Sequence, residues 1–244
     1  MPRGLTLRGM LLDQAQRHYR GDAGRRYHQN KRGIPDCALP WVARLRAEKL
    51  ASYVSASAVV LEYGVGLGWN LAQLKCGRKL GFDVADFLEP SLRELGIDFV
   101  ADTQSLAENS IDTVICHHTL EHVLDPPAIL REIHRLLAPS GKLLLFVPLE
   151  REARYSRFHR DEPNHHLYSW NPQTLGNLVE ESRFQVTEAG PGQFGYSRFA
   201  AVWAAKLHFG ETGFRALRRL LHLLKPAREV RVIAVKPNST LPSL

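Results

Sequence analysis

A short glycine-rich run is the part of this sequence best suited to bind a ligand. The apolar stretch Val59-Val60-Leu61 ends in Glu62, and Gly64, Gly66 and Gly68 follow at alternate positions. Glycine tolerates positive φ and lets a ligand approach the backbone where a Cβ atom would collide. A buried strand that turns sharply at such a loop can cradle a nucleotide-like cofactor. The alternative is an ordinary tight loop, because alternating glycines alone are a weak signal.

Two aspartates further along the chain are spaced to contact the same cofactor. Asp83 lies about 20 residues beyond Gly64, the distance at which an acid accepts hydrogen bonds from ribose hydroxyls in nucleotide-binding folds. Asp102 follows the next expected strand and is placed to receive an adenine amino group. Each has a structural alternative: Asp83 as a surface acid or the cap of a helix near Ala85, and Asp102 as a turn residue.

Histidines supply the candidates for proton transfer. His118 and His122 lie near the end of the fourth expected strand, and imidazole has an unperturbed pKa near 6.5, which suits proton removal from an acceptor. For His122 a structural hydrogen bond is an equally good interpretation. His165 and His166 lie in a later loop, where contact with a substrate and exposure to solvent are both plausible.

The same histidines raise the question of a metal site. The later group consists of His159, Asp161, Glu162, His165 and His166. Its spacing offers no helical pair of histidines, and Pro163 marks a loop, so a zinc or iron site is disfavoured. His118 to His122 spells the H-x-x-E-H of some zinc peptidases, but we prefer a non-metal interpretation there too.

Strand-like and helix-like segments alternate along the chain and predict an α/β fold with a parallel sheet. The expected strands are 58–62, 79–83, 98–100, 113–116 and 142–147. Helices are expected between them, one directly after the glycine loop and one that is capped by Asp125 and stopped by Ser140-Gly141. Parallel sheets bind ligands beyond the carboxyl ends of their strands. The residues at these ends are Glu62, Asp83, Asp102 and His117.

Composition narrows the class of protein. The 244 residues, 44% of them hydrophobic, suit one large domain, and three scattered cysteines support neither a disulfide framework nor a cysteine zinc site. Without a long apolar segment, we expect a cytoplasmic protein. The net charge of +7 lies mostly near the two ends of the chain, which disfavours nucleic acid as a partner but does not exclude RNA or anionic lipid.

Several motifs in register resemble the class I S-adenosylmethionine-dependent methyltransferases, and most closely the small-molecule branch called methyltransferase type 11 or 23. The motifs are LEYGVGLG (61–68), GFDV (81–84), Asp102, IDTVICHHTLEHV (111–123) and HLYSWN (166–171). The resemblance covers about residues 58–184. It implies a Rossmann-like, seven-stranded, mostly parallel sheet with helices on both faces and a reversed last strand, for which 184–188 and 230–235 are candidate strands six and seven.

The resemblance also implies a role for each residue of the cofactor site. Glu62 would order the glycine loop or meet the methionine amino group through water, Asp83 would bind the ribose, and Asp102 the adenine. The backbone of His117 would touch the methionine moiety. The full expected S-adenosyl-L-methionine site is Glu62, Tyr63, Gly64, Gly66, Gly68, Asp83, Asp102, Thr103 and His117. His117 and His118 depart from the serine or asparagine that this family often has after strand four.

The implied reaction is methyl transfer to an oxygen or nitrogen of a small-molecule or glycan/lipid-precursor acceptor, with His118, His122, His165 and His166 as catalytic candidates. The alternatives are an RNA or protein methyltransferase that uses the basic flanks, and a nicotinamide-dependent oxidoreductase. The oligomeric state is left open.

The flanks of the core are expected to determine the acceptor. We divide the chain into a helical leader or lid (1–57), a cofactor-binding core (58–189), an insertion (190–229) and a last strand with tail (230–244). The insertion contains a basic amphipathic helix over 211–225, with Phe214, Leu217, Leu221 and Leu224 opposite Arg215, Arg218 and Arg219. Such a helix packs against the core or touches a membrane surface.

Overall fold

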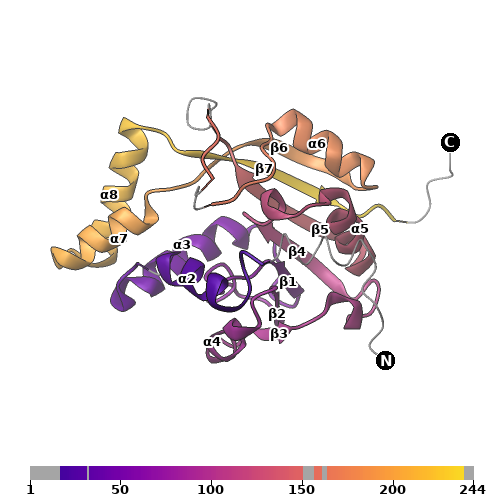
Figure 1. Cartoon of the computed structure of the whole chain (residues 1–244), viewed down its shortest axis with the longest axis horizontal. Coiled ribbons are helices and arrows are strands. Elements are labelled where there is room, and N and C mark those ends of the chain that lie inside the picture. Colours follow the sequence, from indigo (N-terminus) through magenta and orange to yellow (C-terminus); the bar gives the residue numbers. More distant parts are fainter. Residues whose placement is uncertain (1–16, 32, 151–156, 161–163, 239–244) are drawn as a thin grey trace.

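A seven-stranded mixed sheet forms the centre of the molecule (Figure 1). The computed structural model describes residues 17–31, 33–150, 157–160 and 164–238. In spatial order the strands are β3 (Asp98–Val100), β2 (Arg78–Phe82), β1 (Val59–Tyr63), β4 (Ile111–His117), β5 (Leu137–Pro148), β7 (Arg228–Val235) and β6 (Gln185–Gln193). The first five strands pair in parallel, and β7 runs antiparallel to both β5 and β6. The expected fold, with its reversed last strand, is confirmed.

Helices cover both faces of this sheet. They are α2 (Gly21–Lys31), α3 (Leu39–Ala51), α4 (Glu89–Glu94), α5 (Pro126–Leu136), α6 (Pro172–Glu181), α7 (Ser197–Lys206) and α8 (Gly210–Leu224). Leucines and isoleucines of α5 and α6 pack with one face of the strands, and apolar residues of α3 and α4 pack with the other. Because both faces of the central strands are covered, β1 and β4 are apolar runs rather than alternating patterns.

The glycine loop leads into turns and not into the expected helix. After Gly68, the N–H groups of Leu71 and Ala72 donate to the Gly68 carbonyl oxygen at 3.1 and 2.9 Å, and the Leu74 N–H donates to the Leu71 carbonyl oxygen at 3.0 Å, but these turns form no helix before β2. The 14 residues 64–77 join β1 to β2. A parallel crossover needs about a dozen residues or more. The connection is therefore long enough for a crossover, and after the glycine loop it consists of turns with Leu71 and Leu74 buried in the core.

Helix α5 begins as expected and ends earlier than expected. The Asp125 carboxylate accepts a hydrogen bond from the Ala128 N–H at 2.9 Å, and two prolines open the helix. The helix ends at Leu136 and β5 starts at Leu137, so Ser140 lies inside the strand, where its N–H donates to the Lys236 carbonyl. Leu136 and Leu137 are both buried, and this packing ends the helix before the Ser140-Gly141 signal is reached. Between β3 and β4 the expected helix is only a 3-10 turn, Thr103–Ser105.

The leader and the insertion pack against each other beside the sheet (Figure 1). Their shared apolar cluster contains Ile34, Ala38, Val42, Ala200, Ala201, Ala204 and Phe214. Arg215 on α8 reinforces this contact through an ion pair with Glu48 on α3 at 2.7 Å. None of the described helices is both long and apolar enough to cross a membrane.

The inward stripe of α8 differs from the expected one. Phe214 and His222 are buried and Arg218 faces the interior, whereas Leu224 is exposed. Phe214 and Leu217 of the expected stripe do pack against the apolar cluster, but further along the helix the inward side carries Arg218 and His222 in place of Leu224. Leucines at several angles around this helix had concealed which side faces the core.

Candidate functional site

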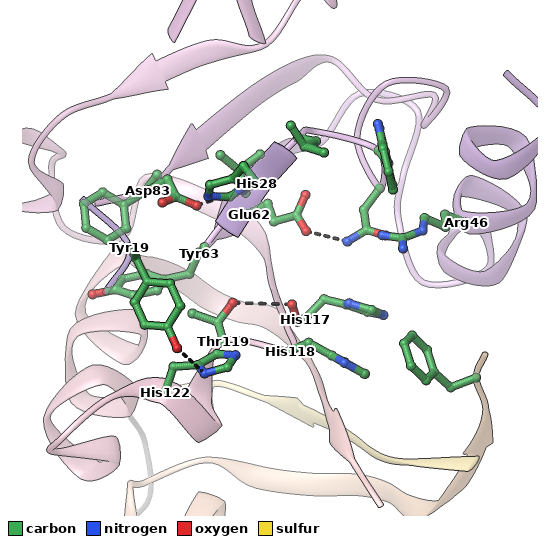
Figure 2. A pocket seen from close by; sticks show the side chains of 18 of the residues that line it. Tyr19, His28, Arg46, Glu62, Tyr63, Asp83, His117, His118, Thr119 and His122 are labelled. Atoms are coloured by element: carbon green, nitrogen blue, oxygen red, sulfur yellow. Dashed lines mark hydrogen bonds between the residues drawn. The ribbon is translucent and has the colours of Figure 1, made fainter. Parts of the chain in front are cut away.

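A cavity of about 1040 Å³ opens at the carboxyl ends of β1, β2 and β4. Side chains of the leader, of α3, of α8 and of the segment after β6 complete its walls. In Figure 2, Glu62, Asp83 and His28 lie on one side of this pocket, and His117, His118 and His122 on the other. The cavity lies where parallel sheets bind ligands.

The three glycines of the loop have different tasks. Their φ angles are +82° for Gly64, +52° for Gly66 and +73° for Gly68. A Cβ atom on Gly64 would lie 2.2 Å from the Thr119 Oγ1, and one on Gly68 would lie 2.8 Å from a side chain of α4. At Gly66 the nearest atom is the His28 Cε1 at 3.8 Å, so the space beside it is open. Gly64 and Gly66 line the pocket, and Gly68 packs behind it.

Asp83 holds this loop in shape. One carboxylate oxygen accepts a hydrogen bond from the Gly66 N–H at 2.8 Å, and the other accepts from the Ala85 N–H at 3.0 Å. The carboxylate therefore ties the end of β2 to the loop that follows β1, while it also lines the pocket. Each carboxylate oxygen retains a second lone pair for a ligand.

Asp102 and Thr103 line the same cavity near β3. The Asp102 carboxylate accepts from the Gln104 N–H at 2.9 Å and caps the 3-10 turn. Thr103 is buried, and its carbonyl accepts from the Arg135 Nη2 at 3.0 Å. Asp102 is thus a turn residue, as the sequence allowed, and it also faces the cavity.

Glu62 is a buried carboxyl group at the floor of the pocket, 1% exposed. Its Oε1 accepts a hydrogen bond from the Asn70 side chain, and its Oε2 has no partner among the described residues. Burial raises the pKa of Glu62 to about 8, although Asn70 and the nearby Arg46 act in the opposite direction. A buried, half-satisfied carboxyl group of this kind attracts a cationic ligand.

Arg46 lies next to Glu62 and was not expected from the sequence. Its Nη1 donates to the Asn70 side chain at 3.3 Å, and its guanidinium lies 5.4 Å from the centre of the Trp69 ring. Burial lowers the pKa of Arg46, partly offset by the Glu62 charge. A carboxyl group and a guanidinium therefore stand side by side at one end of the pocket (Figure 2).

His117 and His118 form the lip of the pocket with two residues from distant parts of the chain. The His118 Nε2 lies 3.1 Å from the Glu229 Oε2, and Glu229 also pairs with Lys49. The Lys49 Nζ lies 3.3 Å from the His117 Nε2. Burial lowers the pKa of His118 to about 4, so the ring is neutral at pH 7 although Glu229 favours its charged form. His118 has φ of +53°, which fixes its backbone in the left-handed region.

His122 faces the leader. Its Nδ1 lies 2.7 Å from the Tyr19 hydroxyl, which also donates to the Asn164 carbonyl at 3.2 Å. His166 packs edge-on against His122 and bonds Glu150, which places it behind the wall of the pocket. His165 is exposed and stacks on His18 at 5.1 Å, and it is not among the lining residues. Of the four histidines named as catalytic candidates, His118 and His122 line the cavity.

The described part of the chain contains two clusters in which the histidine and glutamate donor atoms all lie within 4.8 Å of one another. The first consists of His117, His118 and Glu229, and the second of Glu121, His122 and His166. His118 and His122 of the H-x-x-E-H spacing therefore belong to different groups, and that spacing does not form one zinc site. In the first group the Lys49 ammonium already pairs with Glu229.

Sequence reasoning missed the residues that reach the pocket from far along the chain. Arg46, Lys49, Arg218 and Arg231 line the pocket, and Glu229 pairs with Lys49 beside it. A signal did exist for two of them. In the alternating Glu229-Val-Arg-Val232 the two charged residues share one face of the strand, and that face had to lie against polar groups.

Comparisons with known proteins agree with this geometry. The model of the methyltransferase domain family matches residues 36–189. The chain is 29% identical over 162 residues to phosphoethanolamine N-methyltransferase 1 of Triticum aestivum, covering 58% of this chain and 31% of that protein. It is 44% identical over 59 residues to a ubiquinone biosynthesis O-methyltransferase of Xanthomonas oryzae pv. oryzae, covering 24% of this chain and 25% of that protein. The matched parts thus span about a third or less of these relatives.

A solved structure shows the same fold. It is phosphoethanolamine N-methyltransferase 2 of Haemonchus contortus in complex with S-adenosyl-L-methionine, with 17% sequence identity and a TM-score of 0.54 over 80% of this chain and 52% of that one. The family model covers more than half of this chain, and the sheet order and glycine loop agree with it. The chain belongs to the methyltransferase domain family, within the class I S-adenosylmethionine-dependent type.

Proposed function

We propose that the chain binds S-adenosyl-L-methionine and transfers its methyl group to an oxygen or nitrogen of a small-molecule acceptor. The observation that carries this proposal is the buried Glu62, whose Oε2 lacks a partner within the described residues beside the open edge of Gly66. Family membership supports the same activity.

The residues present fit the methionine end of this cofactor. An amino acid group carries an ammonium and a carboxylate on one carbon, and Glu62 and Arg46 offer the two complementary charges side by side. Because Arg46 is held by Asn70, which also bonds Glu62, one amide orients both groups. We assign Glu62 to the ammonium and Arg46 to the carboxylate.

The residues at the ends of β2 and β3 fit the adenosine end. Asp83 retains lone pairs for ribose hydroxyls, and Asp102 and Thr103 lie where the adenine would follow. The open space at Gly66 admits the ligand against the backbone, where a side chain would exclude it. Tyr63 and Gly64 complete this wall, whereas Gly68 acts only by letting the loop pack on α4.

When bound, S-adenosyl-L-methionine supplies an electrophilic methyl group on a sulfonium. The protein then has to align the acceptor, exclude water and, where needed, remove a proton. His118 is our candidate for proton removal. Its Nε2 faces the Glu229 carboxylate, which accepts a hydrogen bond and leaves Nδ1 as the proton-accepting atom. Glu229 would stabilise the imidazolium that forms, as the carboxylate does in a catalytic triad.

The names of two relatives support a small-molecule acceptor. The curated relatives named above act, by their names, on phosphoethanolamine nitrogen and on a ubiquinone precursor oxygen. Both are small molecules, which favours a small-molecule or lipid-precursor acceptor over RNA or protein. The glycine loop and acids alone do not separate a methyl donor from a nicotinamide cofactor, so the test includes NADH.

The test is a calorimetric titration of the purified protein with S-adenosylmethionine, S-adenosylhomocysteine and NADH. The first two are expected to bind, and preferential binding of NADH would overturn the proposal. Asp83→Asn should weaken S-adenosylhomocysteine binding about tenfold to a hundredfold, because a charged hydrogen bond contributes about 1.5 to 3 kcal/mol. Asp86→Asn, an exposed acid three residues away, is the matched control.

A second experiment identifies the acceptor. A methyl-labelled donor is incubated with the enzyme and separate pools of small metabolites, RNA and protein. Label in the metabolite pool is the expected result. Label confined to RNA or protein would exclude the small-molecule assignment while leaving cofactor binding intact.

A further inference from the structure

Two arginines enter the pocket at the end that the cofactor assignment leaves unused. Arg218 comes from α8 and Arg231 from β7, and both line the cavity. In the sheet, β7 is separated from β2, where Asp83 lies, by β1, β4 and β5. The acids and the arginines therefore occupy opposite ends of one pocket.

Both arginines carry a buried nitrogen that lacks a hydrogen bond. The Nε atoms of Arg218 and Arg231 are shielded from solvent and have no partner in the described part of the chain. The Nη2 of Arg231 pairs with the exposed Glu188 at 3.2 Å, and this ion pair does not involve the Arg231 Nε. Burial also lowers the pKa of Arg218, with the Glu229 charge acting in the opposite direction. Unpaired buried donors are costly, and a charged group increases that cost.

The local charges leave a positive excess. Lys49, Arg218 and Arg231 give three positive charges, and Glu229 and Glu188 give two negative ones, so the excess is one. Arg46 adds to this excess, because its charge also acts on Lys49 and Glu229, although it stands beside Glu62. A ligand with a negative group would remove the excess and satisfy both Nε atoms at once.

We infer that the acceptor carries an oxyanion, either a phosphate monoester or an ionised carboxylic acid, which Arg218 and Arg231 hold at the β7 end of the pocket. This inference deepens the proposed function and rests on it. Guanidinium groups bind such oxyanions through two parallel N–H donors, and two guanidinium groups from different elements can grip separate oxygens. The reacting oxygen or nitrogen would then extend back past His118 toward the methyl donor, because His118 lies between these two ends.

The first test measures binding of matched small probes. Phenyl phosphate, benzoate, phenol and aniline are titrated by calorimetry into the protein, both with and without saturating S-adenosylhomocysteine. Phenyl phosphate and benzoate are expected to bind at least tenfold more tightly than phenol and aniline. Equal affinity for phenol would overturn the inference. The ratio of the affinities for phenyl phosphate and benzoate shows whether the site prefers phosphate or carboxylate.

The second test uses three variants. Arg218→Gln and Arg231→Gln should each weaken binding of the preferred anion at least tenfold and leave S-adenosylhomocysteine affinity unchanged. Arg219→Gln, an exposed arginine on the same helix, should change neither. Unaltered anion binding in both pocket variants would sink the inference.

The two proposals fail in different ways. A protein that binds the anion but not S-adenosylhomocysteine contradicts the proposed function. A protein that binds S-adenosylhomocysteine but discriminates none of the four probes contradicts the oxyanion site. A loss of cofactor affinity in Arg218→Gln would assign that arginine to the cofactor and also contradict it.

Discussion

The proton on Glu62 links cofactor binding to pH. Burial raises the pKa of this carboxyl group to about 8, so it is mostly protonated at pH 7 when the pocket is empty of cations. An ammonium placed against its Oε2 favours the ionised form. Binding at pH 7 therefore requires that a proton leave Glu62, and the free energy of that step reduces the affinity.

We predict that affinity for S-adenosylhomocysteine rises from pH 6 to about pH 8 and then levels off. The slope approaches tenfold per pH unit below the raised pKa, since one proton is released on binding. Calorimetry in buffers of different ionisation enthalpy measures that proton. Glu62→Gln should bind more weakly and lose the dependence over this range. A wild-type affinity that is flat from pH 6 to 8 would contradict the assignment.

Among the residues of the pocket, the sequence predicted those that belong to one short motif and missed those that come from distant parts of the chain. Glu62, Gly64, Gly66 and Asp83 belong to one motif whose spacing encodes their positions, and the structure brings them to one cavity. Lys49 and Glu229 are 180 residues apart and meet only because α3 crosses the end of β7. No local pattern encodes such a contact.

Among the elements, the leader closes one side of the pocket. The Tyr19 hydroxyl bonds the His122 ring and the Asn164 carbonyl, while Tyr27 and His28 of α2 line the cavity. Tyr19 therefore joins the leader to two segments on the far side of the pocket.

Tyr19→Phe should loosen this closure without unfolding the core. We expect faster hydrogen exchange in α2 and faster dissociation of S-adenosylhomocysteine, by about tenfold or more, because the change removes the hydroxyl's hydrogen bonds to His122 and Asn164. Tyr53→Phe, whose hydroxyl bonds the exposed Glu188 at 3.2 Å, is the control and should leave both rates unchanged. If exchange in α2 matches the wild type, the leader is held by other contacts.

The outer surface of α8 carries the features of a membrane-contacting helix. Leu223 and Leu224 are 75% and 74% exposed, and Arg219 and Lys225 lie near them in the sequence. Exposed leucines beside basic groups favour an anionic lipid surface. Membrane contact through residues 211–225, one of the two alternatives for this helix, stays a proposal that rests on the exposed end of the helix.

The combined change Leu223→Ser and Leu224→Ser should abolish co-sedimentation with vesicles that contain anionic lipid. Methyl transfer to a water-soluble acceptor should persist, because these side chains point away from the pocket lining. A double variant that still sediments with vesicles, or a wild-type protein that never does, would exclude membrane contact through this helix.

Strands were easier to predict than helices because of how each is buried. The core strands were located, although β5 begins five residues before the expected strand, since strands covered on both faces are rich in apolar residues. The helix expected after the glycine loop was wrong, because turns follow there instead. The inward side of α8 was right for Phe214 and Leu217 and wrong for Leu224, since leucines surround the helix.

In the whole molecule, Glu229 joins three distant parts of the fold. It is fully buried on β7 and bonds Lys49 of α3 and His118 at the end of β4. Burial acts to raise the pKa of Glu229, but the His118 hydrogen bond and the Lys49 charge outweigh it, and the net pKa lies below 4.5. Its stabilising effect is therefore present above the ordinary pKa of 4.5 and is lost as pH falls through the lower folded value.

Glu229→Gln should lower the free energy of unfolding by about 3 kcal/mol at pH 7, the low end of the range for one partner of a buried pair. The low end applies because Lys49 keeps 28% of its side chain exposed. Urea unfolding monitored by fluorescence provides the value. The double variant Lys49→Met with Glu229→Gln should recover part of the loss, and the wild-type advantage should shrink below pH 4.5. A single variant as stable as the wild type would disprove this role.

The place of β7 in the sheet has a consequence for synthesis on the ribosome. This strand is the last of the seven along the chain, yet it inserts between β5 and β6. Until it emerges, both neighbours present bare edges that can pair with other nascent chains. This gap is therefore the last part of the sheet to close, and the end of the pocket that holds Arg231 is the last to be assembled.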